Sequence, residues 1–150
     1  MAGQFDPSVF LDQTMTEASS TSRTPVPVGE YQGITGEVSI KQATSKEGAT
    51  LTFLEVPIEI DSAEVRKALE TDRNPSVRYS ALLEFNDHGG IDTGKGKNVG
   101  LGRIREATGL NKPGEPFSFR QLAGRPLKVA IKHRTDGENI YAEVRAVAPL

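Results

Sequence analysis

Apolar and polar residues alternate in five separate segments of this chain, and this period of two constrains the fold more than any other feature. Side chains on a β-strand point in turn to the two faces of a sheet, so each segment is predicted to be a strand with one buried face. The second segment is the clearest, because Leu54, Val56, Ile58 and Ile60 share one face. The five predicted strands are residues 31–41, 51–60, 77–85, 127–134 and 140–147.

The same alternation assigns a buried face to each of the other strands. Pro57 lacks an N–H group, so we expect the second strand to lie at a sheet edge or to carry a bulge. The Asp136-Gly137 pair predicts a tight hairpin turn between the last two strands. The side chains expected to be buried are Ile34, Val38 and Ile40; Val77, Tyr79, Ala81, Leu83 and Phe85; Leu127, Val129 and Ile131; and Ile140, Ala142, Val144 and Ala146.

Two short helices interrupt the strands. Asp61 or Ser62 can cap a helix over residues 63–70. Asn98 is placed to cap a second helix that buries Leu101, Ile104 and Ala107 and ends at Gly109. The chain is therefore predicted to be mainly β, with five strands and a helix between the third and fourth. This order is that of an OB-like barrel, with a β-sandwich as the alternative.

Residues 1–28 differ in composition from residues 29–150, which we take as the barrel domain. Ser and Thr are frequent from Thr14 to Thr24, and such a segment buries too little apolar area to fold alone. We therefore interpret residues 1–28 as a flexible or docking N-terminal arm. Its apolar patch, which could dock onto the same domain or onto a neighbour, consists of Phe5, Val9, Phe10 and Leu11.

The residue types present do not favour catalysis, metal binding or insertion into a membrane. The chain has no cysteine and two histidines, His88 and His133, which lie in different segments, so we expect no metal site. No apolar run approaches the roughly 20 residues that cross a bilayer, and the first residues do not resemble a secretory signal. We therefore expect a cytoplasmic protein that is not an enzyme and needs no cofactor.

A glycine-rich loop at 86–97 contains the sequence GGIDTGKG, which is close to a nucleotide-binding phosphate loop. Gly96 stands where such a loop has the Ser or Thr that holds Mg²⁺, so we expect no nucleotide binding. Glycine amides beside Lys95 and Lys97 could still cradle a phosphate group.

Charge is distributed unevenly along the chain. Residues 1–90 carry seven Lys or Arg and fourteen Asp or Glu, a balance of −7, whereas residues 91–150 carry eleven and six, a balance of +5. On the outward strand faces, aromatic rings alternate with cations, and single-stranded nucleic acid needs both. The predicted binding residues are Tyr31, Lys41, Phe53, Arg78, Lys95, Lys97, Arg103, Arg105, Lys128, Lys132, Arg134 and Tyr141.

Residues 82–111, 116–134 and 138–148 together resemble a group of small bacteriophage proteins. The shared pattern includes Pro27 with Gly29-Glu30-Tyr31, the helix 101–107 and the strand 124–129. The resemblance implies an OB-like protein that binds single-stranded DNA in phage replication or recombination, in the cytoplasm of the infected host. The alternative is a virion protein, such as a capsid decoration or cement subunit, whose arm orders on its own copies or on capsid proteins.

Overall fold

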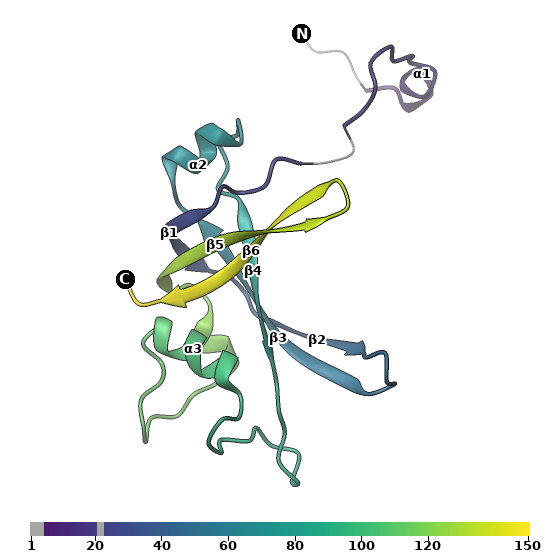
Figure 1. Ribbon diagram of the computed structural model, residues 1–150. Coiled ribbons are helices and arrows are strands. Elements are labelled where there is room, and N and C mark those ends of the chain that lie inside the picture. The colour runs from purple at the N-terminus through teal and green to yellow at the C-terminus, as the bar shows by residue number, and fades with distance from the viewer. Residues whose placement is uncertain (1–4, 21–22) are drawn as a thin grey trace.

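One antiparallel sheet and four short helices make up the computed structural model, which describes residues 5–20 and 23–150 (Figure 1). In chain order the elements are α1 (Pro7–Leu11), β1 (Gly29–Thr35), β2 (Ser39–Thr44), β3 (Thr50–Ile60), α2 (Ala63–Ala68), β4 (Ser76–Leu82), α3 (Val99–Ala107), the 3₁₀ helix η1 (Phe119–Leu122), β5 (Pro126–Asp136) and β6 (Asn139–Ala148). The mainly β prediction is confirmed. Helix α1, which lies in the polar arm, was not predicted.

The six strands form one open sheet in the order β2-β3-β1-β5-β6, with β4 on the other edge of β3. Every described pairing is antiparallel. Within the described residues β4 and β6 lie close together but share no ladder, so the sheet does not close. The prediction of five strands in a barrel is therefore wrong in strand number and closure, and the alternative of two stacked sheets is not formed either.

The first predicted strand, 31–41, is broken into β1 and β2 where it runs along β3. Strand β3 pairs with β4 through Phe53–Glu59, while its other edge is shared by β2 and β1. Pro57 lies opposite the break, and its carbonyl oxygen accepts a hydrogen bond from the Gly36 N–H at 2.8 Å. The register also shifts by one residue across this break, from the pair Thr35–Ile58 to the pair Ser39–Glu55. Strand β3 therefore lies inside the sheet, and Pro57 occupies an irregularity of the bulge type, the second of the two expected alternatives.

The core lies on the inner face of the sheet, between the strands and α3. The buried faces predicted for β3, α3 and β5 are confirmed: Leu54, Val56, Ile58, Ile60, Leu101, Ile104, Ala107, Leu127, Val129 and Ile131 are all buried. Val77, Ala81 and Leu83 of the third predicted strand are also buried, and Tyr79 and Val38 pack against them. Phe85 is exposed, because β4 ends at Leu82.

The buried face of β1 is the one that was predicted to be exposed. Gly33 and Thr35 face the core, Tyr31 packs against it, and Ile34 is exposed. A Cβ atom on Gly33 would lie 2.6 Å from Ile58 Cγ2, so the absence of a side chain lets β1 approach β3 closely. A larger residue at position 33 would therefore not fit on this buried face. Ile40 of β2 is also exposed, because β2 extends past the core.

Strand β6 departs from strict alternation at a bulge. The register with β5 shifts between Ala130 and Ile131, which pair with Ala146 and Val144. The extra residue, Arg145, reverses the alternation beyond it, so Val147 packs against the core in place of Ala146. Ile140 is exposed as well, because the β5–β6 hairpin extends beyond the sheet (Figure 1).

The N-termini of α2 and α3 differ in how their first residues are hydrogen-bonded. Ser62 caps α2, because its hydroxyl accepts a hydrogen bond from the Val65 N–H. Asn98 has left-handed backbone angles and its side chain makes no capping bond to α3, so the predicted cap is wrong. That side chain instead exchanges two hydrogen bonds of 2.8 Å with the backbone of Glu84, which fastens α3 to the end of β4. Gly109 follows α3 with a φ of +78°, as predicted.

The buried hydroxyl of Thr35 supports a prediction about stability. It accepts a hydrogen bond from the Arg125 N–H at 2.8 Å and donates one to the Leu122 carbonyl oxygen. Thr35→Val keeps the shape of the side chain but leaves these backbone groups unpaired, so we expect the free energy of unfolding to fall by about 1–3 kcal/mol in urea denaturation. Thr44→Val, at an exposed strand position, is the control. Equal denaturation midpoints for the two variants would contradict the assignment.

Candidate nucleic-acid interface

A groove of about 1040 Å³ lies between the start of β4 and the start of β6. Three separate parts of the chain form its walls. They are Ser20 with residues 23–26, Leu69 and Thr71 with residues 73–78, and residues 139–142. The first part leads into β1, the second joins α2 to β4, and the third belongs to the β5–β6 hairpin. Segments far apart in the sequence therefore meet at this one surface.

The groove carries positive charge. Arg23, Arg73 and Arg78 line it, and none of its described lining residues is acidic. Arg78 Nε lies 3.0 Å from Glu55 Oε2, but the Arg78 side chain keeps 64% of its surface exposed. Within the described residues, neither Arg23 nor Arg73 forms an ion pair. A hollow lined by one sign of charge attracts ions of the opposite sign, here anions.

Tyr141 adds an aromatic ring to the groove. It is 43% exposed, and the Arg134 guanidinium carbon lies 4.9 Å from the centre of its ring. Arg134 is itself held by Glu143, with Nε and Oε1 2.6 Å apart, and Lys132 Nζ lies 3.8 Å from the other oxygen of the same carboxylate. The hairpin thus presents a ring with a cation against it, next to the three arginines.

Residues 24–28, which the sequence assigns to the arm, are attached to the sheet and position Arg23. The Val26 side chain is buried, and its carbonyl oxygen accepts a hydrogen bond from His133 Nε2 at 2.7 Å. The Tyr31 hydroxyl donates to the Pro27 carbonyl oxygen at 2.8 Å. Burial, with a smaller contribution from the charge of Glu64, raises the pKa of Tyr31 above its ordinary value. The outward stacking position predicted for Tyr31 is therefore wrong.

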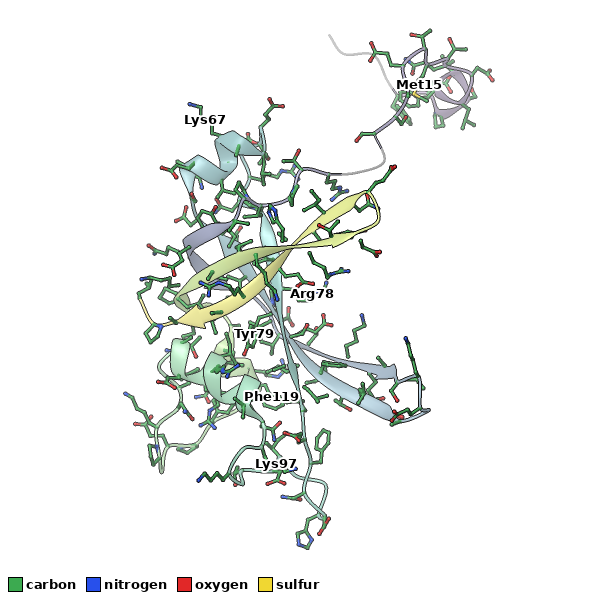
Figure 2. The ribbon with its side chains drawn as sticks, viewed as in Figure 1. Met15, Lys67, Arg78, Tyr79, Lys97 and Phe119 are labelled. Atoms are coloured by element: carbon green, nitrogen blue, oxygen red, sulfur yellow. The ribbon has the colours of Figure 1, made fainter. Side chains whose placement is uncertain are left out.

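Lys41, Phe53 and Arg78 lie on the outer face of the sheet, as predicted. Phe53 is half-buried, and its strand neighbours on the two sides are Lys41 and Leu82. Arg78 lies on the same face. It is the strand neighbour of Pro57, and Pro57 and Phe53 are four residues apart on β3, an even spacing that places both on one face. Figure 2 shows Arg78 between the β5–β6 hairpin and the β2–β3 pair. The outer face thus continues from the groove towards β2.

The remaining predicted cations lie elsewhere. Lys95 and Lys97 belong to the loop before α3, whereas Arg103 and Arg105 belong to α3 itself, which packs against β4 and β6. None of the four lines the groove. Lys97 Nζ lies 3.7 Å from a carboxylate oxygen of Glu84. The Arg105 guanidinium packs 4.2 Å from the ring centre of Phe117, and its Nε donates to a loop carbonyl. Lys128 lies at the start of β5, opposite Gln32.

Several N–H groups of the glycine-rich loop are hydrogen-bonded within the loop. The N–H groups of His88 and Gly90 donate to the Asn86 side chain at 2.9 and 3.0 Å. The Gly94 N–H donates to Asp92 Oδ1 at 2.8 Å. These N–H groups have acceptors within the loop, so they are not gathered around an open centre.

No group of three or more His, Cys, Asp or Glu side chains in residues 5–20 and 23–150 is arranged to hold a metal ion. No helix in the same residues is both long enough and apolar enough to cross a membrane.

Two groove residues, Arg23 and Arg73, were missed by the sequence analysis. Arg23 lies in a Ser- and Thr-rich segment, and Arg73 lies in the turn before β4. Neither belongs to an alternating strand pattern, so no periodicity marked them. Only the folding of the two segments against the hairpin places them together.

Comparison with known proteins adds no family to this description, since no protein-family model and no curated protein matches the chain.

Truncation tests the attachment of residues 24–28. Deleting residues 1–19 leaves every contact of Val26 and Pro27 in place, so we expect the thermal midpoint to stay unchanged. Deleting residues 1–28 removes the buried Val26 side chain, so we expect the free energy of unfolding to fall by about 2 kcal/mol. Equal stability of the two truncated proteins in urea denaturation would show that this segment is not part of the folded domain.

Proposed function

We propose that this protein binds single-stranded DNA without sequence preference and catalyses no reaction. The observation that carries the proposal is the groove, where Arg23, Arg73 and Arg78 meet the half-exposed ring of Tyr141 and no described lining residue is acidic. Proteins that bind single strands use cations that follow the backbone and rings on which unpaired bases stack.

In this proposal the arginines and the tyrosine of the groove contact different parts of the nucleic acid. Arg23 and Arg73, which have no ion-pair partner within the described residues, contact phosphates. Tyr141 stacks a base on the ring face that Arg134 does not cover. The bound DNA strand continues over the outer face of β4 and β3 towards Phe53 and Lys41. Phosphate contacts and stacking carry little sequence information, so binding is expected to tolerate any sequence.

The topology supports the same proposal. If β1 and β2 are taken as one bent strand, the sheet order becomes β4-β3-β1-β5-β6, and its two end strands lie near each other. We infer a partly open barrel of the OB type. In that fold the second and third strands and the two flanking hairpins bind oligonucleotides. Those elements here are β3, β4 and the hairpins β2–β3 and β5–β6, and the groove lies beside the latter hairpin.

The biological setting is part of the proposal and comes from the phage-like sequence pattern. It places the protein in the cytoplasm of an infected bacterium, as an accessory of DNA replication or recombination. A structural role in the virion is the second candidate, favoured by the exposed apolar side chains of α1. Absence of any affinity for oligonucleotides would favour this second role.

Salt dependence tests the groove arginines. The double variant Arg23→Ala and Arg73→Ala is expected to bind labelled oligo-dT more weakly. Its log–log salt slope should be less steep by about 1.4, since each phosphate contact to a single strand contributes about 0.7. Fluorescence anisotropy at several salt concentrations measures both quantities.

The matched control is Lys95→Ala with Arg103→Ala, which removes the same charge from α3 and the loop before it, outside the lining of the groove. We expect its salt slope to equal that of the unmodified protein. A reduced slope in this control, with an unchanged slope in the groove variant, would place the site at α3.

Substitution of Tyr141 tests stacking separately from charge. Tyr141→Ala removes the ring, so affinity for oligo-dT is expected to fall by the 1–3 kcal/mol typical of one stacked base, roughly 5- to 150-fold. Tyr141→Phe keeps the ring and should bind like the unmodified protein. The salt slope should not change in either variant. Equal affinity of the Ala and Phe variants would show that the ring is not a stacking platform.

A further inference from the structure

The side chains of the first 20 residues carry negative charge only. Their acidic residues are Asp6, Asp12 and Glu17, and the same stretch contains no Lys, Arg or His. All three acidic residues are exposed, and within the described residues none of them forms an ion pair. Residues 5–20, which we call the acidic arm, therefore offer three carboxylates that have no cationic partner.

The groove beside the β5–β6 hairpin has the opposite charge. Arg23, Arg73 and Arg78 line it, and none of its described lining residues is acidic. Arg23 and Arg73 have no ion-pair partner within the described residues, and the Arg78 side chain keeps most of its surface exposed beside Glu55. One chain thus holds a set of carboxylates and a set of arginines that attract each other.

The chain itself joins the acidic arm to the groove. Ser20, the last residue of the arm, is one of the groove's lining residues. Glu17 precedes it by three residues, and an extended chain spans at most about 3.6 Å per residue, so their Cα atoms stay within about 11 Å of each other. This distance is close to the Debye length of about 10 Å at 0.1 M ionic strength. The charge of Glu17 therefore acts on the groove in every conformation of the arm.

The rest of the arm is long enough to fold back over the groove. Asp12 precedes Ser20 by eight residues, which allows a span of up to about 29 Å. Residues 12–20 belong to no helix or strand, so folding back disrupts no regular structure. None of the residues of α1 is buried, and in Figure 1 this helix stands clear of the sheet. Packing of α1 against the domain therefore does not hold the arm away from the groove.

We propose that the acidic arm folds back onto the arginines of its own groove and competes there with single-stranded DNA. This inference rests on the proposed function, since the arm and the DNA share one site. A short flexible tether gives the arm an effective concentration in the millimolar range, so a contact of only about 0.1 mM affinity lowers the affinity for DNA about tenfold. Covering a bound strand is the less favourable role for the arm, because carboxylates and phosphates repel each other.

Neutral substitutions in the full chain test the competition. The triple variant Asp6→Asn, Asp12→Asn and Glu17→Gln removes the three charges, and Asn at position 6 can still cap α1. We expect it to bind labelled oligo-dT about tenfold more tightly than the unmodified protein at low salt, as measured by fluorescence anisotropy. The difference should shrink as salt is added, because salt screens the attraction between the arm and the groove.

The matched control removes the same charge from other exposed positions. Glu47→Gln, Asp87→Asn and Glu115→Gln lie outside the lining of the groove. This triple variant should bind oligo-dT like the unmodified protein. An equal gain of affinity in the two triple variants would show that net charge, and not the arm, sets the affinity, and would overturn the proposal.

A spin label detects the contact of the arm with the groove without DNA. The chain has no cysteine, so Met15→Cys, at a side chain that is 81% exposed, provides a single labelling site. The label should broaden the amide signals of residues 139–142, which form the hairpin wall of the groove. Neutralising the three acidic residues leaves the tether unchanged but should reduce this broadening, and adding oligo-dT should reduce it as well.

The results distinguish failure of this inference from failure of the proposed function. If the arm variant binds oligo-dT as the unmodified protein does, or more weakly, competition is overturned and DNA binding stands. Broadening that does not change when the arm is neutralised would overturn competition too. If none of these proteins binds oligo-dT, the proposed function fails, and the inference fails with it.

Discussion

Burial of one face of β3 is the interaction on which the rest of the structure depends. Four alternate residues of this strand, Leu54, Val56, Ile58 and Ile60, are completely buried, so the strand cannot shift by one residue without exposing all of them. One edge of β3 binds β4, and its other edge binds β2 and β1. The register of this strand therefore determines where Lys41, Phe53 and Arg78 lie on the outer face.

A few buried polar contacts then connect the irregular segments to this framework. Thr35 joins β1 to the chain before β5, Asn98 joins α3 to the end of β4, and the carbonyl groups of Val26 and Pro27 attach the chain before β1. A buried polar group is costly when it is unpaired, so each contact specifies one position for its segment. The third of these contacts positions Arg23 at the groove.

The proposed function implies a path for the nucleic acid across the molecule. In this proposal a single strand of DNA lies in the groove near the β5–β6 hairpin and continues over the outer face of the sheet towards β2.

Sequence alone determined those features that depend on local periodicity. Alternation predicted β3, β4 and β5 with their buried faces, the spacing in 99–107 predicted α3, and the turn at Gly137 was set by local chemistry, since it needs a positive φ. Tertiary structure decided what depends on close approach between distant segments. Gly33 lies against Ile58 on the face of β1 that is buried, the bulge at Arg145 changed the buried face of β6, and the missing ladder between β4 and β6 left the sheet open. The groove belongs to this second group, because Arg23, Arg73 and Tyr141 come from three segments whose meeting leaves no signal in any one of them.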